Sequence, residues 1–277
     1  MINVALSHDV DRIKKTYQYF THAARAIAKI DLKMLNYQVN SIFKQEEPYW
    51  QFPKIIEIEQ KFDVKSTFYI LNESMRFRIR DFRDWQLSQG RYDIDEPNLV
   101  EVIRWLDKNG WEIGVHGSYY SYKEKDLLLN EKNKLESLLG HKIIGTRQHY
   151  LNIDRFTWEI QKEVGFEYDS TWGFTDAVGF KHGMVKPFTP FNDKFTVFPM
   201  SIMDSCFMDE KDRWEKFDKI VNVVDKHNSL LVINWHHRVF NENEFPGYSE
   251  NYIRVIEELK KMGAKFYTIG EYFSKFH

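Results

Sequence analysis

Residues 2–11, INVALSHDVD, combine a predicted strand with one histidine and two carboxylates. The mostly apolar residues 2–6 predict a short buried strand, and the polar residues follow at once. In an α/β sheet, ligands and catalytic groups collect at the carboxyl ends of the strands. Carboxylates this close repel each other unless a cation or a proton holds them. We therefore expect separate roles for Asp9 and Asp11, one as a base and one as a metal ligand.

The composition allows one large α/β domain or two small ones. The chain has 277 residues, and 43% of them are hydrophobic, enough to fill a sizeable core. Its 39 basic and 41 acidic residues give a formal net charge of -2, which argues against a nucleic-acid partner. The single cysteine, Cys206, excludes an intrachain disulfide and a cysteine-rich zinc site.

The sequence carries no targeting or membrane-spanning pattern. No basic region followed by a long apolar run is visible at the N-terminus. No apolar stretch approaches the roughly 18 residues that a membrane span needs. We therefore expect a cytoplasmic protein without a membrane span, and its oligomeric state stays open.

Strand-like and helix-like segments alternate six or seven times, without a linker. We expect later strands at 64–71, 111–115, 142–145, 166–170, 196–203, 230–234 and 265–269. We expect helices at 12–46, 52–62, 99–108, 127–139, 156–164, 214–226 and 251–262. This order predicts a single α/β domain over 1–277, with a parallel sheet that is open or closed as a (β/α) barrel and has outer helices.

Two segments stand out from this alternation. Within residues 12–46, apolar side chains are spaced for one buried helix face, namely Ile27, Ile30, Leu35, Val39 and Ile42. Residues 74–96 carry five arginines with little apolar periodicity and are predicted to be an insertion loop. Its arginines either form a solvated surface or contact an anionic substrate.

Polar residues that can take part in catalysis or metal binding follow the predicted strands. They are Asp9, Asp11, His116, Arg147, His149, Asp204, His236 and His237. In a parallel barrel these positions converge on one rim. Imidazole and carboxylate ligands with an open position form a water-activating divalent metal site, which suits hydrolysis of an amide or ester. The alternative for His116 is a hydrogen-bonded core histidine.

Hydrolysis also needs a base and an acid. Asp9 is the candidate base, and Arg147 either holds it or forms a plain salt bridge. His236 or His237 is the candidate acid. Neighbours in an extended chain point in opposite directions, so one of the two histidines enters the site, and we favour His236.

The ordered set resembles the polysaccharide deacetylase family, also called the NodB-homology or carbohydrate esterase family 4 domain. Ser7-His8-Asp9-Val10-Asp11 resembles its Thr-Phe-Asp-Asp motif, and His116-Gly117-Ser118-Tyr119-Tyr120 resembles His-Ser/Thr-x-x-His. Arg147-Gln148-His149-Tyr150 resembles Arg-x-Pro-Tyr, and Trp235-His236 resembles the late Leu-x-His motif. The resemblance implies a distorted (β/α) barrel that hydrolyses acetyl groups on sugars with a bound divalent metal, usually zinc.

The sequence departs from the family at two metal ligands. Val10 stands where the family has its metal-binding aspartate, and we expect Asp11 to replace it. Tyr120 stands where the second metal histidine belongs, and His149 is the expected substitute. The alternative for His149 is substrate contact or packing. If neither substitution holds, the site binds metal weakly or not at all.

The remaining candidates are weaker. Substrate-binding positions are predicted at Tyr150, Asp169, Trp235 and His237. Asp204 either pairs with an arginine or caps the next helix. No phosphate-binding loop or Gly-x-Ser-x-Gly motif is present, so nucleotide-dependent and serine-hydrolase functions are excluded.

The first functional hypothesis is a metal-dependent deacetylase acting on an N-acetylated sugar or a glycan precursor of surface polysaccharide or lipopolysaccharide. The second is a barrel that has lost catalysis and acts as a carbohydrate-binding or assembly protein. A metal-independent hydrolase of a non-sugar amide also stays open.

Overall fold

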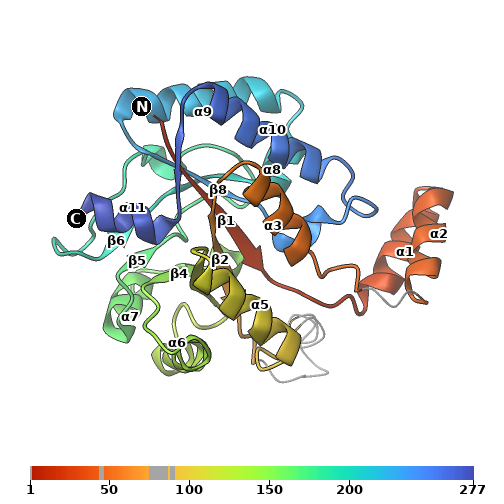
Figure 1. The fold of residues 1–277 in the computed structure, drawn as a ribbon, viewed down its shortest axis with the longest axis horizontal. Helices are drawn as coiled ribbons and strands as arrows, with labels where there is room; N and C mark the ends of the chain where they lie inside the picture. The colour runs from red at the N-terminus through yellow and green to blue at the C-terminus, as the bar shows by residue number, and fades with distance from the viewer. Residues whose placement is uncertain (1, 44–46, 75–86, 88–90) are drawn as a thin grey trace.

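The computed structural model describes residues 2–43, 47–74, 87 and 91–277. Its described strands form one parallel sheet in the order β6-β5-β4-β3-β2-β1-β8-β7, and β9 also pairs with β1. The strands are β1 Asn3–Val10, β2 Ser66–Leu71, β3 Glu112–Gly117, β4 Gly145–Gln148, β5 Tyr168–Asp169, β6 Thr196–Val197, β7 Met200–Met203, β8 Leu230–Asn234 and β9 Lys265–Tyr267. The sheet curls into a half-barrel, which confirms the predicted distorted (β/α) barrel (Figure 1).

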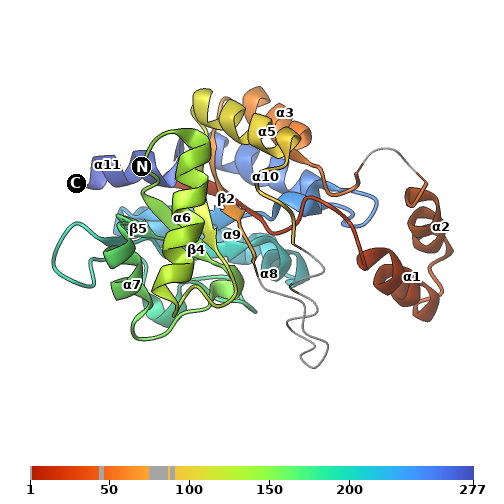
Figure 2. The ribbon, with the colours of Figure 1, turned by 90° about the horizontal axis from the view of Figure 1, so that it is seen from below.

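Most of the helices surround this sheet (Figures 1 and 2). They are α1 Gln18–Ala28, α2 Leu32–Ser41, α3 Phe52–Lys61, α5 Pro97–Lys108, α6 Lys125–Leu139, α7 Thr157–Val164, α8 Asp204–Asp209, α9 Arg213–His227, α10 Tyr248–Lys261 and α11 Ile269–Phe276. The sheet and the outer helices share one large apolar core, while α1 and α2 contribute nothing to it among the described residues. Within the described ranges, no helix has the length and apolar character needed to cross a bilayer.

Strand β1 lies inside the sheet, between β2 and β8, and is longer than the sequence predicts. It continues through Ser7, His8 and Asp9 because β2 pairs with its second half, in the register Ser7↔Thr67 and Asp9↔Tyr69. Its side chains alternate between two sides of the sheet. The His8 ring contacts Glu59 on one side, and the Asp9 carboxylate contacts Arg147 on the other. Pairing with neighbours, rather than apolar character, sets the end of this strand.

Strand β4 also differs from its prediction. Residues 142–145 were expected to form it, but it spans Gly145–Gln148. Arg147 therefore lies inside the strand, paired with His116 of β3, and its side chain is fully buried. The apolar residues at 143 and 144 precede the strand because the hydrogen-bonded ladder begins at Gly145.

The predicted single helix over 12–46 is wrong. The chain forms α1 and α2, separated by a break at residues 29–31, where Ile30 adopts a φ of 55°. The side chain of Asp31 accepts a hydrogen bond from Met34 N at 2.9 Å and caps the second helix. Four of the five residues of the predicted buried face are exposed instead, with Ile27 at 62% and Val39 at 48%, and Leu35 is half-buried.

The predicted insertion loop at 74–96 falls largely outside the described residues, including its first four arginines. Arg91 is described and exposed. Tyr92 is buried, and its hydroxyl donates to Val10 O at 2.7 Å and accepts from Leu71 N at 2.9 Å. The end of this segment therefore ties together the carboxyl ends of β1 and β2.

Glu131 of α6 lies under the end of β3. Its Oε2 accepts from Ser118 N at 3.2 Å, and its Oε1 is buried without a described partner. Burial raises the pKa of the Glu131 carboxyl from 4.5 to about 8. Between pH 4.5 and about pH 8, the Glu131 carboxyl loses its proton in the unfolded chain but keeps it in the folded chain. The free energy of unfolding therefore falls as the pH rises through this range.

Glu131→Gln is therefore expected to stabilise the protein at neutral and higher pH, by about 3 kcal/mol near pH 7, and to have little effect near pH 4. Urea unfolding of both proteins across this range measures the difference. Glu159→Gln, at an exposed position of α7, is the matched control and is expected to change neither stability nor its pH dependence. Parallel pH profiles for wild type and Glu131→Gln would contradict the prediction.

Candidate functional site

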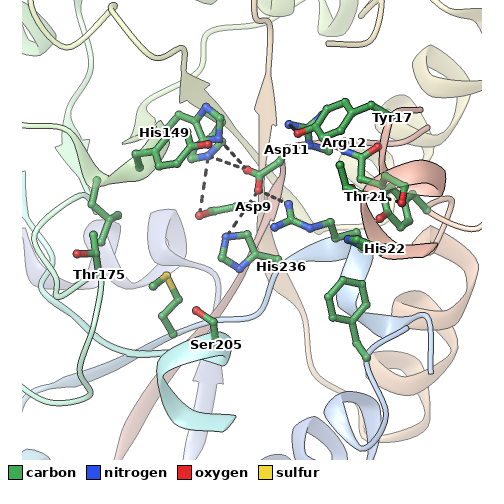
Figure 3. A pocket seen from close by; sticks show the side chains of 18 of the residues that line it. Asp9, Asp11, Arg12, Tyr17, Thr21, His22, His149, Thr175, Ser205 and His236 are labelled. Carbon is green, nitrogen blue, oxygen red and sulfur yellow. Dashed lines mark hydrogen bonds and ion pairs between the residues drawn. The ribbon is translucent and has the colours of Figure 1, made fainter. Parts of the chain in front are cut away.

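A cavity of about 560 Å³ lies at the carboxyl ends of the strands. Its lining comes from distant parts of the chain: Asp9 and Asp11 near the end of β1, His116 of β3, His149 after β4, and His236 after β8. Figure 3 shows Asp9, Asp11, His149 and His236 facing a common space, with Thr21 and His22 reaching it from α1. The predicted convergence on one rim thus appears in the structure.

Three side chains in this cavity have the arrangement of metal ligands. One ligand atom from each of Asp11, His116 and His149 lies within 4.8 Å of the other two. Asp11 Oδ1 is 3.2 Å from His116 Nε2 and 3.6 Å from His149 Nε2. A carboxylate and two imidazoles form a ligand set that zinc and similar divalent ions accept.

The hydrogen bonding of His116 and the protonation of His149 suit this role. His116 Nδ1 lies 2.9 Å from the carbonyl oxygen of Arg147, so Nδ1 donates there and Nε2 is the ring nitrogen directed toward Asp11. Burial lowers the pKa of His149 to about 3, which keeps this imidazole neutral. Neutral imidazoles are the form that binds metal.

Asp11 provides the strongest test of whether a cation fits. Its Oδ2 accepts from Arg238 Nη1 at 2.5 Å. Its Oδ1 is buried with no hydrogen-bond donor among the described residues, and His149 Nδ1 is likewise buried and unpartnered. Buried polar atoms are normally satisfied, so an acceptor left open between two imidazoles fits a bound cation.

Asp9 is held as an ionised carboxylate on the other side of the group. Its Oδ1 accepts from Arg147 Nη1 at 2.8 Å, and its Oδ2 accepts from Asn234 Nδ2 at 2.8 Å. Burial acts to raise the pKa of Asp9, but the charges of Arg147, His116 and His236 together outweigh it, and the pKa is lowered. Arg147 is itself fixed by Ser7 and Ser170, and all of these groups are buried.

His236 forms a second charged pair at the cavity. Asp204 accepts from its Nδ1 at 2.9 Å and from its backbone N at 2.7 Å. His236 Nε2 lies 3.7 Å from Asp11 Oδ2. Burial acts to lower the pKa of His236, but Asp204 and Asp11 outweigh it and raise the pKa to about 9. The ring is therefore an imidazolium near neutral pH.

Sequence reasoning missed several parts of the site. Asp204 was expected to pair with an arginine or cap a helix, whereas it binds His236 and starts α8. Arg238 and Asn234 were not identified, although each lies two residues from His236, on either side. His22 of α1 also lines the cavity, and sequence reasoning did not identify it.

The predicted substrate-binding residues divide into two groups. Tyr150 lines the cavity, is 56% exposed and stacks near His149 with ring centroids 4.4 Å apart. Asp169, Trp235 and His237 are buried outside the cavity, so these three predictions do not fit their placement.

Each of the three has a structural partner instead. The Asp169 carboxylate accepts from Trp158 Nε1 at 3.1 Å. Trp235 packs in the core, and its neighbour His237 turns inward in the 3₁₀ turn His237–Phe240 to accept from Gln51 N at 3.0 Å. The histidine that reaches the cavity is His236, as the sequence favoured.

Comparison with known proteins shows similarity in structure. The sequence matches no protein-family model and no curated protein. A Mycobacterium smegmatis protein assigned as a polysaccharide deacetylase aligns over 99% of this chain and 89% of its own, with a TM-score of 0.61 and 18% identity. This chain has the polysaccharide deacetylase fold. At such identity the similarity shows the fold alone.

The same fold also occurs in proteins that are not named as deacetylases. The allantoinase PuuE aligns over 100% of this chain and 90% of its own, with a TM-score of 0.62 and 15% identity. The 4-α-glucanotransferase of Thermococcus litoralis aligns over 99% of this chain but 40% of its own, with a TM-score of 0.58 and 17% identity. The reaction must therefore be argued from the site.

Proposed function

We propose that this chain is a metal-dependent hydrolase that removes an acyl group, most specifically N-acetyl, from a sugar or glycan precursor. The observation that carries the proposal is the three-ligand group Asp11, His116 and His149 beside an ionised carboxylate and an imidazolium in one cavity. A divalent ion such as zinc, when bound, would polarise the acyl carbonyl and lower the pKa of the attacking water. The fold shared with a polysaccharide deacetylase supports this choice.

Asp9 is the proposed general base. Both of its oxygens are held, by Arg147 and by Asn234, so the carboxylate has one orientation. Its Oδ2 lies 3.9 Å from His116 Nε2 and so faces the ligand group. From there Asp9 takes the proton of the water as it attacks the acyl carbon. Arg147 acts as a positioning residue that also keeps Asp9 ionised.

His236 is the proposed general acid. Asp204 fixes Nδ1–H, which leaves Nε2–H directed toward the cavity and Asp11. As the tetrahedral intermediate collapses, His236 gives this proton to the leaving nitrogen, and the C–N bond breaks. An amine leaving group requires such a proton, whereas a stable phenolate leaves without one.

His236→Gln is expected to separate these two kinds of leaving group. For an N-acetylglucosamine oligomer, kcat/KM should fall by at least about a hundredfold, and for 4-nitrophenyl acetate by much less. Acetate release and phenolate absorbance measure the two rates. His182→Gln, at an exposed position outside the cavity lining, is the matched control. Equal losses for both substrates would remove His236 from the role of acid.

The proposed function itself is tested by acetate release from a panel of N-acetylated and O-acetylated sugars, with zinc supplied. Turnover of N-acetyl sugars that a chelator abolishes is the expected result. Binding of these sugars without turnover, in protein that holds metal, would overturn the hydrolase proposal in favour of a carbohydrate-binding protein.

A further inference from the structure

Helices α1 and α2 form a hairpin at one edge of the molecule (Figures 1 and 2). Of the large apolar side chains that the described chain exposes, more than half belong to this hairpin and its ends. The most exposed are Phe20 at 77%, Ile27 at 62%, Ile30 at 83%, Leu32 at 72%, Ile42 at 51% and Phe43 at 82%. A concentration of exposed apolar side chains like this marks an interaction surface.

The side of the hairpin that faces the protein is mostly polar. The buried residues are Gln18 and Ala26 in α1 and Gln38 and Ser41 in α2. Lys15 bonds both Gln38 and Glu244, and His22 Nδ1 lies 3.1 Å from Glu244 Oε2. A helix that packs on a globular protein normally turns its apolar face inward. Here the polarity is inverted, so the apolar face is directed to something other than this chain's own core.

Ile30 has an unfavourable backbone conformation that no packing of its side chain compensates. It is a β-branched residue at a φ of 55°, a conformation in which glycine or asparagine is normally found. Its side chain is also the most exposed of the apolar group. A strained residue that gains no packing within the protein points to a role outside it.

The charge of the hairpin identifies the class of partner. Arg25, Lys29 and Lys33 are exposed, and they form no ion pair with any described residue. The one acidic residue in residues 14–43 is Asp31, whose carboxylate already caps α2. Exposed apolar side chains beside unpaired basic ones match a bilayer surface with anionic lipids.

The alternative of a second copy fits less well. In a symmetric dimer the same patch meets itself, so Lys29 and Lys33 would approach their own counterparts. The helices have 11 and 10 residues, too short to cross a bilayer but suited to lying in its interface.

The hairpin is also continuous with the cavity. Four residues of α1 line it: Gln18, Thr21, His22 and Arg25. The helix that carries the apolar residues therefore forms one wall of the site. Whatever binds the outer face lies close to the cavity.

We propose that the α1–α2 hairpin docks on an anionic lipid surface, with its apolar residues among the headgroups and its lysines on lipid phosphates. Docking brings the cavity close to the surface. A consequence that rests on the proposed function is that the substrate is a lipid-linked or otherwise amphiphilic glycan.

Cosedimentation with vesicles tests the docking without metal or substrate, so its result is independent of the proposed reaction. The protein is expected to bind vesicles of phosphatidylglycerol and phosphatidylcholine in equal parts, and not vesicles of phosphatidylcholine alone. Ile27→Ser/Ile30→Asn/Ile42→Ser should lower the partition coefficient at least about tenfold, because it removes much of the inserted apolar area. Lys29→Glu/Lys33→Glu should lower it as well, and Met262→Ser, at a 46% exposed position on α10's end, should not.

Ile30→Asn alone provides a further check, because asparagine tolerates the backbone conformation. We expect it to raise the Tm while weakening vesicle binding. A lower Tm would mean that Ile30 packs within the protein, against the proposal. Equal binding to both kinds of vesicle, or binding to neither, would overturn the docking proposal. So would self-association in sedimentation velocity that the triple variant abolishes, which would assign the face to a second copy.

Discussion

Asp9→Asn is expected to lower kcat for deacetylation by about a thousandfold, because the amide cannot accept the proton of the attacking water. The substitution keeps the size of the side chain, and Asn234 and the three proposed ligands remain in place. Metal content should therefore stay at the wild-type level. Initial rates of acetate release, with metal measured on the same preparations, separate loss of the base from loss of the ion.

This substitution also leaves Arg147 without a counter-charge. Arg147 is fully buried, and breaking a buried ion pair on one side costs about 3 kcal/mol or more. Asp9→Asn should thus unfold at lower urea concentration than wild type. In Asp9→Asn/Arg147→Met the uncompensated charge is gone, so part of this stability should return while activity stays lost.

The double variant decides between two explanations of a lost rate. If activity returned together with stability, Asp9 would be a structural partner of Arg147 and not the base. If the single variant folded and kept its full rate, the base would lie elsewhere in the cavity.

The sheet and the rim of the site were predictable from the sequence because both follow from local pattern. Alternating strands and helices specify a parallel sheet, and polar residues at strand ends then meet at one edge. Asp9, Asp11, His116 and His236 were placed in this way, and the structure brings them to one cavity. The two-residue period of an extended chain predicted that only one of His236 and His237 enters the site, and His236 was favoured because it directly follows Trp235.

Contacts between residues far apart in the sequence were not predictable. The partner of His236 is Asp204, 32 positions earlier, and the partner of Asp11 is Arg238, 227 positions later. The basic side chain that lies beside a given carboxylate depends on the order of the strands in the sheet. The order β1-β8-β7, which brings these residues together, cannot be read from any short stretch of sequence.

The hairpin was mispredicted for a different physical reason. An apolar period indicates a helix face that avoids water, but not what covers that face. Residues 12–46 carry such a period, and we assigned it to the core. The core is instead closed without them, and Ile27 and Ile42 face outward. The break in the helix at Ile30 could not be predicted either, because isoleucine rarely adopts the positive φ that Ile30 has there.

Metal binding is expected to depend on all three residues of the group, with zinc near one equivalent in the wild-type chain purified without added metal or a histidine tag. Asp11→Ala, His116→Ala and His149→Ala each remove one of three protein ligands. Each should lower the affinity so far that no zinc survives purification, because a site with two protein ligands binds weakly. Elemental analysis of the four proteins measures this directly.

Thermal unfolding gives a second measure that needs no catalysis. Free zinc at about a hundred times its Kd should stabilise the wild type by about 2.7 kcal/mol and leave the three variants unchanged. His182→Ala, at an exposed histidine outside the cavity lining, should behave as wild type in both experiments. Zinc retained by His149→Ala alone would make His149 a substrate contact and refute the replacement of the family's second histidine. A wild-type chain that holds no metal after dialysis against zinc would refute the metal site as a whole, and the open Oδ1 of Asp11 would then need another cation or a proton to satisfy it.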